Sequence, residues 1–172
     1  MISFYFTKSG GQINFGYIDA NKYKGELIEH PVVDKYYWTI KMNDLKLNST
    51  EKSCDPFCYA IIDSGSSGLM VSQGLYDKIK KQIKMSFPCD ELKSMPDMEF
   101  VLNGKIYSLT PNEYTYEHFD KKRMKKVCKV NISTIYLSRF KEDFIVIGED
   151  FFKKYYIIFD KDRDSVHLGY RN

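Results

Sequence analysis

The residues best placed to do chemistry are an acid and its polar neighbours directly after an apolar run. Residues 59–62 read Tyr-Ala-Ile-Ile, and residues 63–68 read Asp-Ser-Gly-Ser-Ser-Gly. Strands bury their side chains, so an acid at a strand end is paired, solvated in a cleft or used in catalysis. Gly65 lets backbone groups approach Asp63, and the Ser66 hydroxyl is close enough in sequence to hydrogen-bond it. The segment predicts a rigidly held carboxylate, although the same residue types also fit an ordinary surface turn.

A second apolar run has a similar ending. Residues 144–147 read Phe-Ile-Val-Ile, and Gly148 and Glu149 follow them. A third run, residues 155–160, reads Tyr-Tyr-Ile-Ile-Phe-Asp. Each run taken alone predicts a buried strand and carries no chemistry of its own.

The elements that position these runs are mostly strands, because the dominant period of the sequence is two. Residues 3–7 and 12–17 are rich in β-forming residues, and the glycine-containing segment 8–11 between them predicts a hairpin. Residues 36–47 alternate apolar and polar side chains, which predicts one long half-buried strand.

Two further hairpins are expected toward the C-terminus. Residues 98–110 contain Asn103-Gly104, a dipeptide that tolerates the positive φ angles of a type I′ turn. Residues 155–160 and 165–170 are a pair of apolar runs separated by a charged turn.

One helix is predicted, and it begins after Ser72, a plausible N-cap. Leu75, Ile79 and Ile83 recur at a spacing of four, with lysines on the opposite face. The fold class predicted from the residues is therefore mostly β with one or two short helices.

Length and composition exclude several classes of protein. The 172 residues fit a single domain over residues 1–172, and 43% hydrophobic residues exclude a disordered chain. The net charge of +3 is small, so no nucleic-acid partner is expected, and the basic residues 121–126 are interpreted as a solvated loop. No apolar run approaches the about 18 residues of a membrane helix, so no membrane segment is expected in this chain.

The four cysteines favour two disulfides, with four reduced thiols as the alternative. Their spacing fits neither a zinc ribbon nor a redox motif. Disulfides would indicate maturation in an oxidising compartment. The histidines are scattered, so neither a metal site nor a cofactor is expected; they are His30, His118 and His167.

Taken together and in order, these segments resemble the C-terminal lobe of a bilobal pepsin-like aspartic protease. The resemblance implies a closed or partly open β-barrel with one or two short helices. The likeness covers nearly the whole chain, and the abundance of Lys and Tyr resembles the plasmepsins of apicomplexan parasites more than vertebrate pepsins. The residues that carry it are 3–5, 12–16, Tyr37-Trp38, 54–58, 60–66, Cys89, 95–97, Asn103-Gly104, 109–111, Cys128, Ile147-Gly148, 155–156 and 159–160.

The resemblance implies roles for individual residues. Asp63 would be the second of the two catalytic aspartates of the family, and Ser66 the hydroxyl that supports it. Substrate would contact Tyr37 and Ile61 toward the primed side, and Gly65, Ser67 and Met70 in the turn and toward the unprimed side. Disulfides Cys54–Cys58 and Cys89–Cys128 would be the two usual for this lobe.

The sequence departs from the family pattern in two places. Glu149 follows Gly148 where the family usually has Asp, and the loop over the cleft, residues 131–143, lacks the prolines that relatives often carry. Both departures concern subsite details rather than Asp63.

The resemblance also implies a missing partner. Two carboxylates about 3 Å apart share one proton and activate a water in this family, and the second carboxylate belongs to an N-terminal lobe absent from these residues. We therefore expect a peptide or protein substrate, an N-terminal lobe as partner, an inactive isolated chain, and self-association through the exposed inter-lobe surface. The expected location is the secretory pathway, a vacuole or another acidic, oxidising organelle.

Two alternatives stay open. Two copies could pair about a two-fold axis and bring both Asp63 carboxylates together, as in retroviral-type proteases. The chain could instead be a non-catalytic β module that binds extended peptides.

Overall fold

The computed structural model describes residues 1–47, 51–122 and 124–172. Strand is the main secondary structure of the described residues, as predicted, and the strands form one twelve-stranded and one three-stranded sheet. The larger sheet is open, because its main path ends at β12 and at β2. A closed barrel, one form that the resemblance allowed, is therefore not formed by the described residues.

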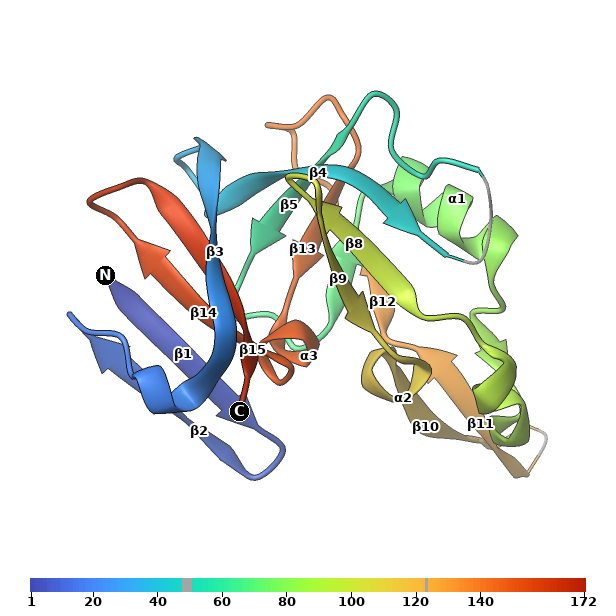
Figure 1. Cartoon of the computed structure of the whole chain (residues 1–172). Helices are drawn as coiled ribbons and strands as arrows, with labels where there is room; N and C mark the ends of the chain where they lie inside the picture. Colours follow the sequence, from blue (N-terminus) through green and yellow to red (C-terminus); the bar gives the residue numbers. More distant parts are fainter. Residues whose placement is uncertain (48–50, 123) are drawn as a thin grey trace.

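One part of the large sheet contains both ends of the chain (Figure 1). Its strands follow the order β3-β15-β14-β1-β2, all antiparallel. Their bounds are Tyr23–Asp34 for β3, Ser165–Arg171 for β15, Tyr155–Asp160 for β14, Ile2–Thr7 for β1 and Gly10–Phe15 for β2. Every residue of β14 is buried, so this central strand fixes the sheet in the core.

The other part of the large sheet carries the segment with Asp63. The main path continues β3-β4-β5-β13-β6-β12, and β8 pairs with both β4 and β9. The bounds are Thr39–Lys46 for β4, Cys58–Ile62 for β5, Leu69–Val71 for β6, Met98–Leu102 for β8, Lys105–Leu109 for β9, Ile132–Thr134 for β12 and Phe144–Ile147 for β13. β13 lies between β5 and β6, parallel to β5.

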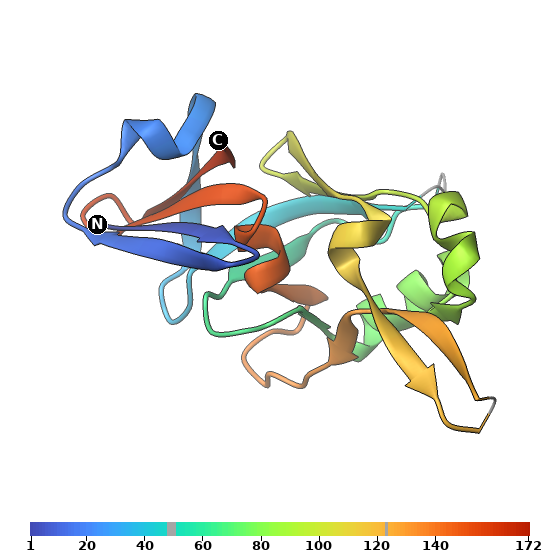
Figure 2. The same ribbon diagram turned by 90° about the horizontal axis from the view of Figure 1, so that it is seen from below.

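A separate three-stranded sheet projects from the body of the molecule, and its long hairpin is the orange and gold ribbon in Figure 2. Its strand order is β10-β11-β7, with bounds Thr115–Asp120, Lys125–Val130 and Ser86–Phe87 respectively. The helices are α1 (Gln73–Gln82), α2 (Pro111–Tyr114) and α3 (Glu149–Phe152), with 3-10 helices η1 (Ala20–Lys22) and η2 (Cys89–Ser94). No helix in the described ranges is long and apolar enough to cross a bilayer.

Several local predictions are confirmed. The hydroxyl of Ser72 accepts a hydrogen bond from the Leu75 N–H at 3.3 Å, and Leu75 and Ile79 are fully buried. The hairpin β8–β9 turns at Asn103 and Gly104, whose φ angles are +46° and +80°. The chemistry of the cap and of the turn therefore fixes these elements locally.

The disulfide pairing is confirmed as well. Cys54 is bonded to Cys58, and Cys89 to Cys128, 39 residues further on. The second bond ties η2 to β11. Two disulfides are consistent with maturation in an oxidising compartment.

Two boundaries and one strand differ from the prediction. The first hairpin turns at Lys8-Ser9, because Gly10 already pairs with Thr7. The strand predicted from residue 36 begins only at Thr39, since the preceding residues form a turn. Strand β3 was not predicted, because most of its side chains are exposed or half-buried and show no clear alternation.

The apolar interior consists of two clusters. The larger one fills the body between the sheet and the helices. The smaller one lies on the opposite face of β5 and β13, where Ile61, Phe144 and Val146 are buried and Tyr37 and Met70 pack beside them. The segment with Asp63 therefore has a core behind it and a small apolar layer in front.

Candidate active site

Strands β5 and β13 set the position of Asp63. They run parallel with Ile61 opposite Val146 and Ile62 opposite Ile147, and the Asp63 N–H donates to the Ile147 carbonyl at 3.0 Å. Side chains alternate along a strand: Ile62 enters the large cluster and Ile61 the small one. Asp63, which follows Ile62, therefore falls on the side of the small cluster.

The turn after β5 holds both carboxylate oxygens of Asp63. The Gly65 N–H donates to Oδ1 at 2.9 Å, and the Ser66 hydroxyl donates to Oδ2 at 2.6 Å. The Asp63 side chain is half-buried. The acid is thus held in one orientation, as the segment predicts, it keeps access to solvent, and it has no ion pair among the described residues.

A crossing of two chain segments supports this turn from behind. The Gly148 N–H donates to the Gly68 carbonyl at 3.1 Å, and the Glu149 N–H donates to the Ser66 carbonyl at 2.6 Å. A Cβ on Gly148 would lie 2.3 Å and 2.4 Å from the carbonyl oxygens of Ser66 and Gly68. No side chain fits there without moving the backbone of the turn.

A mostly apolar cavity of about 290 Å³ lies on one side of Asp63. It brings together the predicted substrate residues Tyr37, Ile61 and Met70. The other residues around Asp63 in this cavity are Tyr36, Trp38, Ile62, Ile135, Leu137 and Val146. Asp63 is the only acid among the described residues that line it. The cavity thus offers an apolar environment next to one carboxylate.

A more polar cavity of about 430 Å³ lies along the turn itself. The predicted residues Gly65 and Ser67 line it, and Met70 lines both cavities. Its remaining lining residues are Ser66, Gly68, Leu69, Tyr116, Val130, Asn131, Ile132 and Ser133. All the predicted catalytic and substrate-binding residues therefore lie at these two adjoining cavities, whereas the four cysteines line neither.

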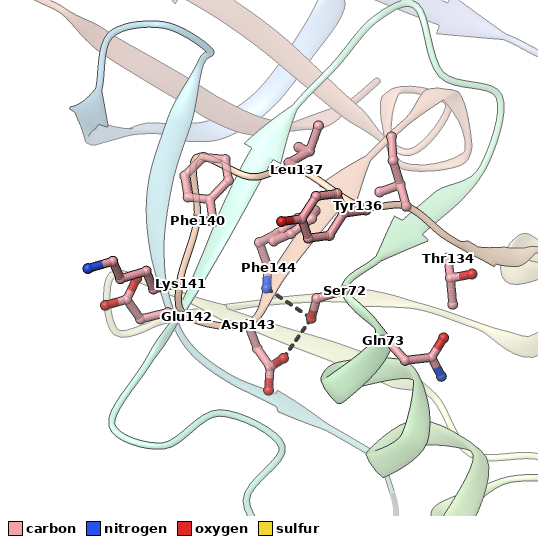
Figure 3. Close-up of a pocket in the computed structure, with 11 residues that line it drawn as sticks. Ser72, Gln73, Thr134, Tyr136, Leu137, Phe140, Lys141, Glu142, Asp143 and Phe144 are labelled. Carbon is pink, nitrogen blue, oxygen red and sulfur yellow. Dashed lines mark hydrogen bonds between the residues drawn. The ribbon is translucent and has the colours of Figure 1, made fainter.

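An anchor that the sequence analysis missed fixes the loop in front of the small apolar cluster. The Ser72 hydroxyl donates to Asp143 Oδ1 at 2.6 Å, and the Lys78 ammonium lies 2.8 Å from Asp143 Oδ2. Figure 3 shows Ser72 bridging Asp143 and the Phe144 N–H beside a cavity of about 260 Å³. Ser72 and Asp143 are far apart in sequence, so no spacing signal could have joined them.

A second acid lies behind the turn, on α3. Asp150 accepts a hydrogen bond from the Asn131 amide at 2.7 Å. Burial raises the pKa of this carboxyl, against the opposing effects of Asn131 and Lys153. Asn131 in turn packs against Gly68, where a Cβ would come within 2.5 Å of its amide nitrogen. Asp150 therefore supports the position of Asn131 beside the turn.

The site offers hydrogen-bond donors and one carboxylate but no cluster of metal ligands. Within the described ranges, no group of three or more His, Cys, Asp or Glu side chains is arranged to hold a metal ion. The chemistry available to this arrangement is that of a positioned acid or base.

Comparison with known proteins identifies relatives of the chain. It is 28% identical to cathepsin E-B of Xenopus laevis over 98% of this chain and 44% of the relative. It is 29% identical to cathepsin D of Bos taurus, over 95% of this chain and 43% of the relative, and 29% identical to gastricsin of Rattus norvegicus, over 94% and 42%. The chain thus spans less than half the length of these curated relatives.

A model of the eukaryotic aspartyl protease family matches residues 1–170, which is nearly the whole chain. The chain belongs to the eukaryotic aspartyl protease family.

Proposed function

We propose that this chain is the C-terminal lobe of an aspartic endopeptidase and supplies Asp63 as one of two catalytic carboxylates. The observation that carries the proposal is the fixed Asp63 side chain, with Gly65 and Ser66 each donating to one of its oxygens. The second carboxylate comes from an N-terminal lobe of the same protein. The coverage of less than half of each relative supports this division.

In the assembled site the two carboxylates lie about 3 Å apart and share one proton, because both cannot be ionised at that distance. One takes a proton from a bound water, which attacks the peptide carbonyl, while the other donates its proton to the carbonyl oxygen. The donors Gly65 and Ser66 keep the Asp63 carboxylate facing this water. Ser66 acts as a positioning residue through Asp63.

The substrate is an extended peptide that passes over Asp63. The apolar cavity with Tyr37 and Ile61 favours an apolar or aromatic substrate side chain on one side of the scissile bond. The polar cavity with Gly65 and Ser67 offers backbone and hydroxyl groups on the other side. Met70 lines both cavities and contacts the substrate on either side of the bond.

An apolar strip on β2 and the segment after it supports the existence of a second lobe. Phe15 is 73% exposed, and Ile13 and Tyr17 are also exposed. Exposed apolar patches of this kind mark interfaces. We propose that the N-terminal lobe covers this surface and that the isolated chain associates with itself through it.

The plasmepsin-like character and the compartment are part of the same proposal. The richness in Tyr and Lys supports a plasmepsin-like subtype. The two disulfides support maturation in the secretory pathway. The shared proton of an aspartate pair supports function in a vacuole or another acidic organelle.

The experiment is peptide hydrolysis at acid pH by the longer protein that contains this chain and, separately, by residues 1–172. In the longer protein, Asp63→Asn lowers kcat by about 10³-fold or more, since a member of a catalytic pair is lost. The matched control is Asp162→Asn, an exposed acid in the β14–β15 turn, which leaves kcat unchanged.

Size-exclusion chromatography accompanies the assay of residues 1–172. Monomeric residues 1–172 are expected to show no turnover. Turnover by this monomer, or full activity of the longer Asp63→Asn protein, overturns the proposal. Turnover that rises with the square of the chain concentration indicates a homodimeric protease instead.

A further inference from the structure

The hairpin β10–β11 projects from the molecule next to the polar cavity beside Asp63 (Figure 2). Strand β10 pairs only with β11, and it has no fully buried residue. Six residue pairs join the strands, from Thr115–Val130 at the base to Asp120–Lys125 at the tip. Strand β10 is therefore an open edge strand, whereas β11 also pairs with β7 near the base of the hairpin.

Cross-strand pairing separates its side chains into two faces, since neighbours along a strand alternate. On one face Glu117 lies opposite Cys128, and Phe119 lies opposite Lys126. Cys128 is tied to η2 by its disulfide, and Lys126 forms an ion pair with Glu117 at 2.9 Å. This face is attached to the rest of the molecule, and its lysine is neutralised.

The other face, which we call the Tyr116 face, has more lysines than acids. Tyr116 lies opposite Lys129, His118 opposite Val127, and Asp120 opposite Lys125. The Tyr116 ring is 47% exposed, and the His118 and Lys125 side chains are exposed. Within the described part of the chain, Lys125 and Lys129 have no ion-pair partner. This face therefore carries two lysines and one carboxylate, Asp120, beside an exposed aromatic ring, which leaves an excess of positive charge.

The Tyr116 face continues from the cavity next to Asp63. Tyr116 lines that cavity together with Gly65, Ser66 and Ser67, the residues of the catalytic turn. A peptide lying against the turn therefore reaches Tyr116 and Lys129 first, and Lys125 further along the hairpin. At about 3.4 Å per extended residue, the strand from Tyr116 to its end accommodates about four peptide residues.

We propose that the Tyr116 face binds an acidic stretch of the polypeptide substrate, outside the residues held next to Asp63. The two lysines attract carboxylates, and the Tyr116 ring, opposite Lys129, provides a flat contact for the peptide next to the turn. Because the face is continuous with the cavity of the catalytic turn, a polypeptide is favoured over a lipid surface. The identity of the occupant rests on the proposed function, whereas its acidic character rests on the face itself.

The test measures binding, so that it does not depend on catalysis. The probes are two fluorescein-labelled 12-residue peptides of identical apolar sequence, one with four Glu residues and the other with Gln at the same positions. Fluorescence anisotropy with residues 1–172 at low ionic strength gives Kd for each. We expect the Glu peptide to bind about tenfold more tightly than the Gln peptide, and added salt to remove the difference.

A double charge reversal, Lys125→Glu with Lys129→Glu, is expected to abolish the preference for the Glu peptide. The matched control reverses Lys24 and Lys46, which are exposed lysines on β3 and β4, and the preference is retained. Tyr116→Ala weakens binding of both peptides by a few-fold, because the shared aromatic contact is lost. Circular dichroism of each variant verifies the fold.

Several results would overturn the proposal. The first is equal binding of the two peptides by the unmodified chain. The second is an unchanged preference for the Glu peptide in the Lys125/Lys129 variant. The third is a loss of that preference in the Lys24/Lys46 control that equals the loss in the Lys125/Lys129 variant. Cosedimentation with phosphatidylserine vesicles that depends on these lysines, without a preference for the Glu peptide, would assign the face to membranes instead. Failure of the proposed protease would appear as an inactive longer protein and leave these Kd values unaffected.

Discussion

Two polar regions of this chain differ in how far they bury an ionisable side chain and in how many hydrogen-bond partners they give it. The turn after β5 leaves Asp63 half-buried and supplies a donor to each of its oxygens. The second region, which we call the histidine junction, contains His30 of β3, Tyr107 of β9 and His167 of β15. There His30 is fully buried, and its Nδ1 has no partner among the described residues.

The junction keeps its histidines neutral. Burial, with a smaller effect of His167, lowers the pKa of His30 to about 4. Burial also lowers the pKa of His167, although Glu29 and Asp160 oppose this shift. Acid therefore acts against the folded state at the junction, because protonation of the buried histidines is favoured only after unfolding.

The largest loss of stability is expected from a substitution at Gly148, where the second chain segment crosses the turn. Gly148→Ala would place a Cβ within 2.4 Å of two carbonyl oxygens, and we expect it to lower the free energy of unfolding by about 3 kcal/mol or more. Urea denaturation measures this. The matched change is Gly65→Ala in the same turn, where the nearest atom is Asp63 Oδ1 at 3.3 Å, and a loss below about 1 kcal/mol is expected. Equal losses would show that the crossing is not tightly packed.

The junction is expected to make stability depend on pH. The unfolded chain binds a proton at His30 below its ordinary pKa of 6.5, whereas the folded chain does so only below about 4. The free energy of unfolding therefore falls as the pH drops from 6.5 toward 4, by about 3 kcal/mol at about 1.4 kcal/mol per pKa unit, and this contribution does not fall further at lower pH.

His30→Gln removes that contribution, since its amide does not titrate. Urea denaturation at pH 7 and pH 4.5 should show a smaller pH dependence in this variant than in the unmodified chain. His118→Gln, on the exposed face of β10, should leave the pH dependence as it was. An unchanged pH dependence in His30→Gln would mean that the pKa of His30 does not differ between the folded and the unfolded chain.

A smaller loss of stability is expected from a substitution of Tyr107, the hydrogen-bond partner of His30. The Tyr107 hydroxyl lies 2.8 Å from His30 Nε2, and burial raises the pKa of Tyr107, so the hydroxyl stays protonated. Tyr107→Phe leaves this nitrogen buried without its partner, which costs about 2 kcal/mol in unfolding free energy at pH 7. Tyr136→Phe, at a side chain that is 86% exposed, serves as the control and should cost less than about 0.5 kcal/mol. Equal costs would show that water replaces the hydroxyl.

The turn that holds Asp63 could be predicted from the sequence, because the residues that determine it are neighbours in the chain. The apolar run of β5, the acid after it and the glycine two residues later together predict a held carboxylate, and the structure has Asp63 in that place. The Asn103-Gly104 turn and the Ser72 cap were predicted for the same reason. In each case a few neighbouring residues determine the geometry.

The junction and the loop anchor depend on contacts between distant segments. His30 meets Tyr107 across 77 residues, and Ser72 meets Asp143 across 71. Strand β3 was missed because its pairing with β15, rather than its own apolar pattern, determines its conformation. Propensity and periodicity report only local preference, so such pairings could not be read from the sequence.

The smallest effect is expected at the Ser66 hydroxyl, and it sharpens the comparison with Tyr107. Ser66→Ala removes the donor to Asp63 Oδ2, but the Asp63 side chain is half-buried, so water can take the place of the hydroxyl. The loss in unfolding free energy should therefore be about 1 kcal/mol or less, below that of Tyr107→Phe. Urea denaturation at pH 7 compares the two variants directly, with Ser67→Ala in the same turn as the control.

The order of the two variants should be reversed for catalysis, with a larger loss of kcat in Ser66→Ala than in Tyr107→Phe. If Ser66 positions Asp63, Ser66→Ala lowers kcat of the longer protein more than KM changes, because the carboxylate no longer keeps one orientation toward the water. Tyr107→Phe, which touches neither cavity, should lower stability without a matching loss of kcat. A Ser66→Ala protein with full kcat would show that the Gly65 N–H alone is sufficient to orient the acid.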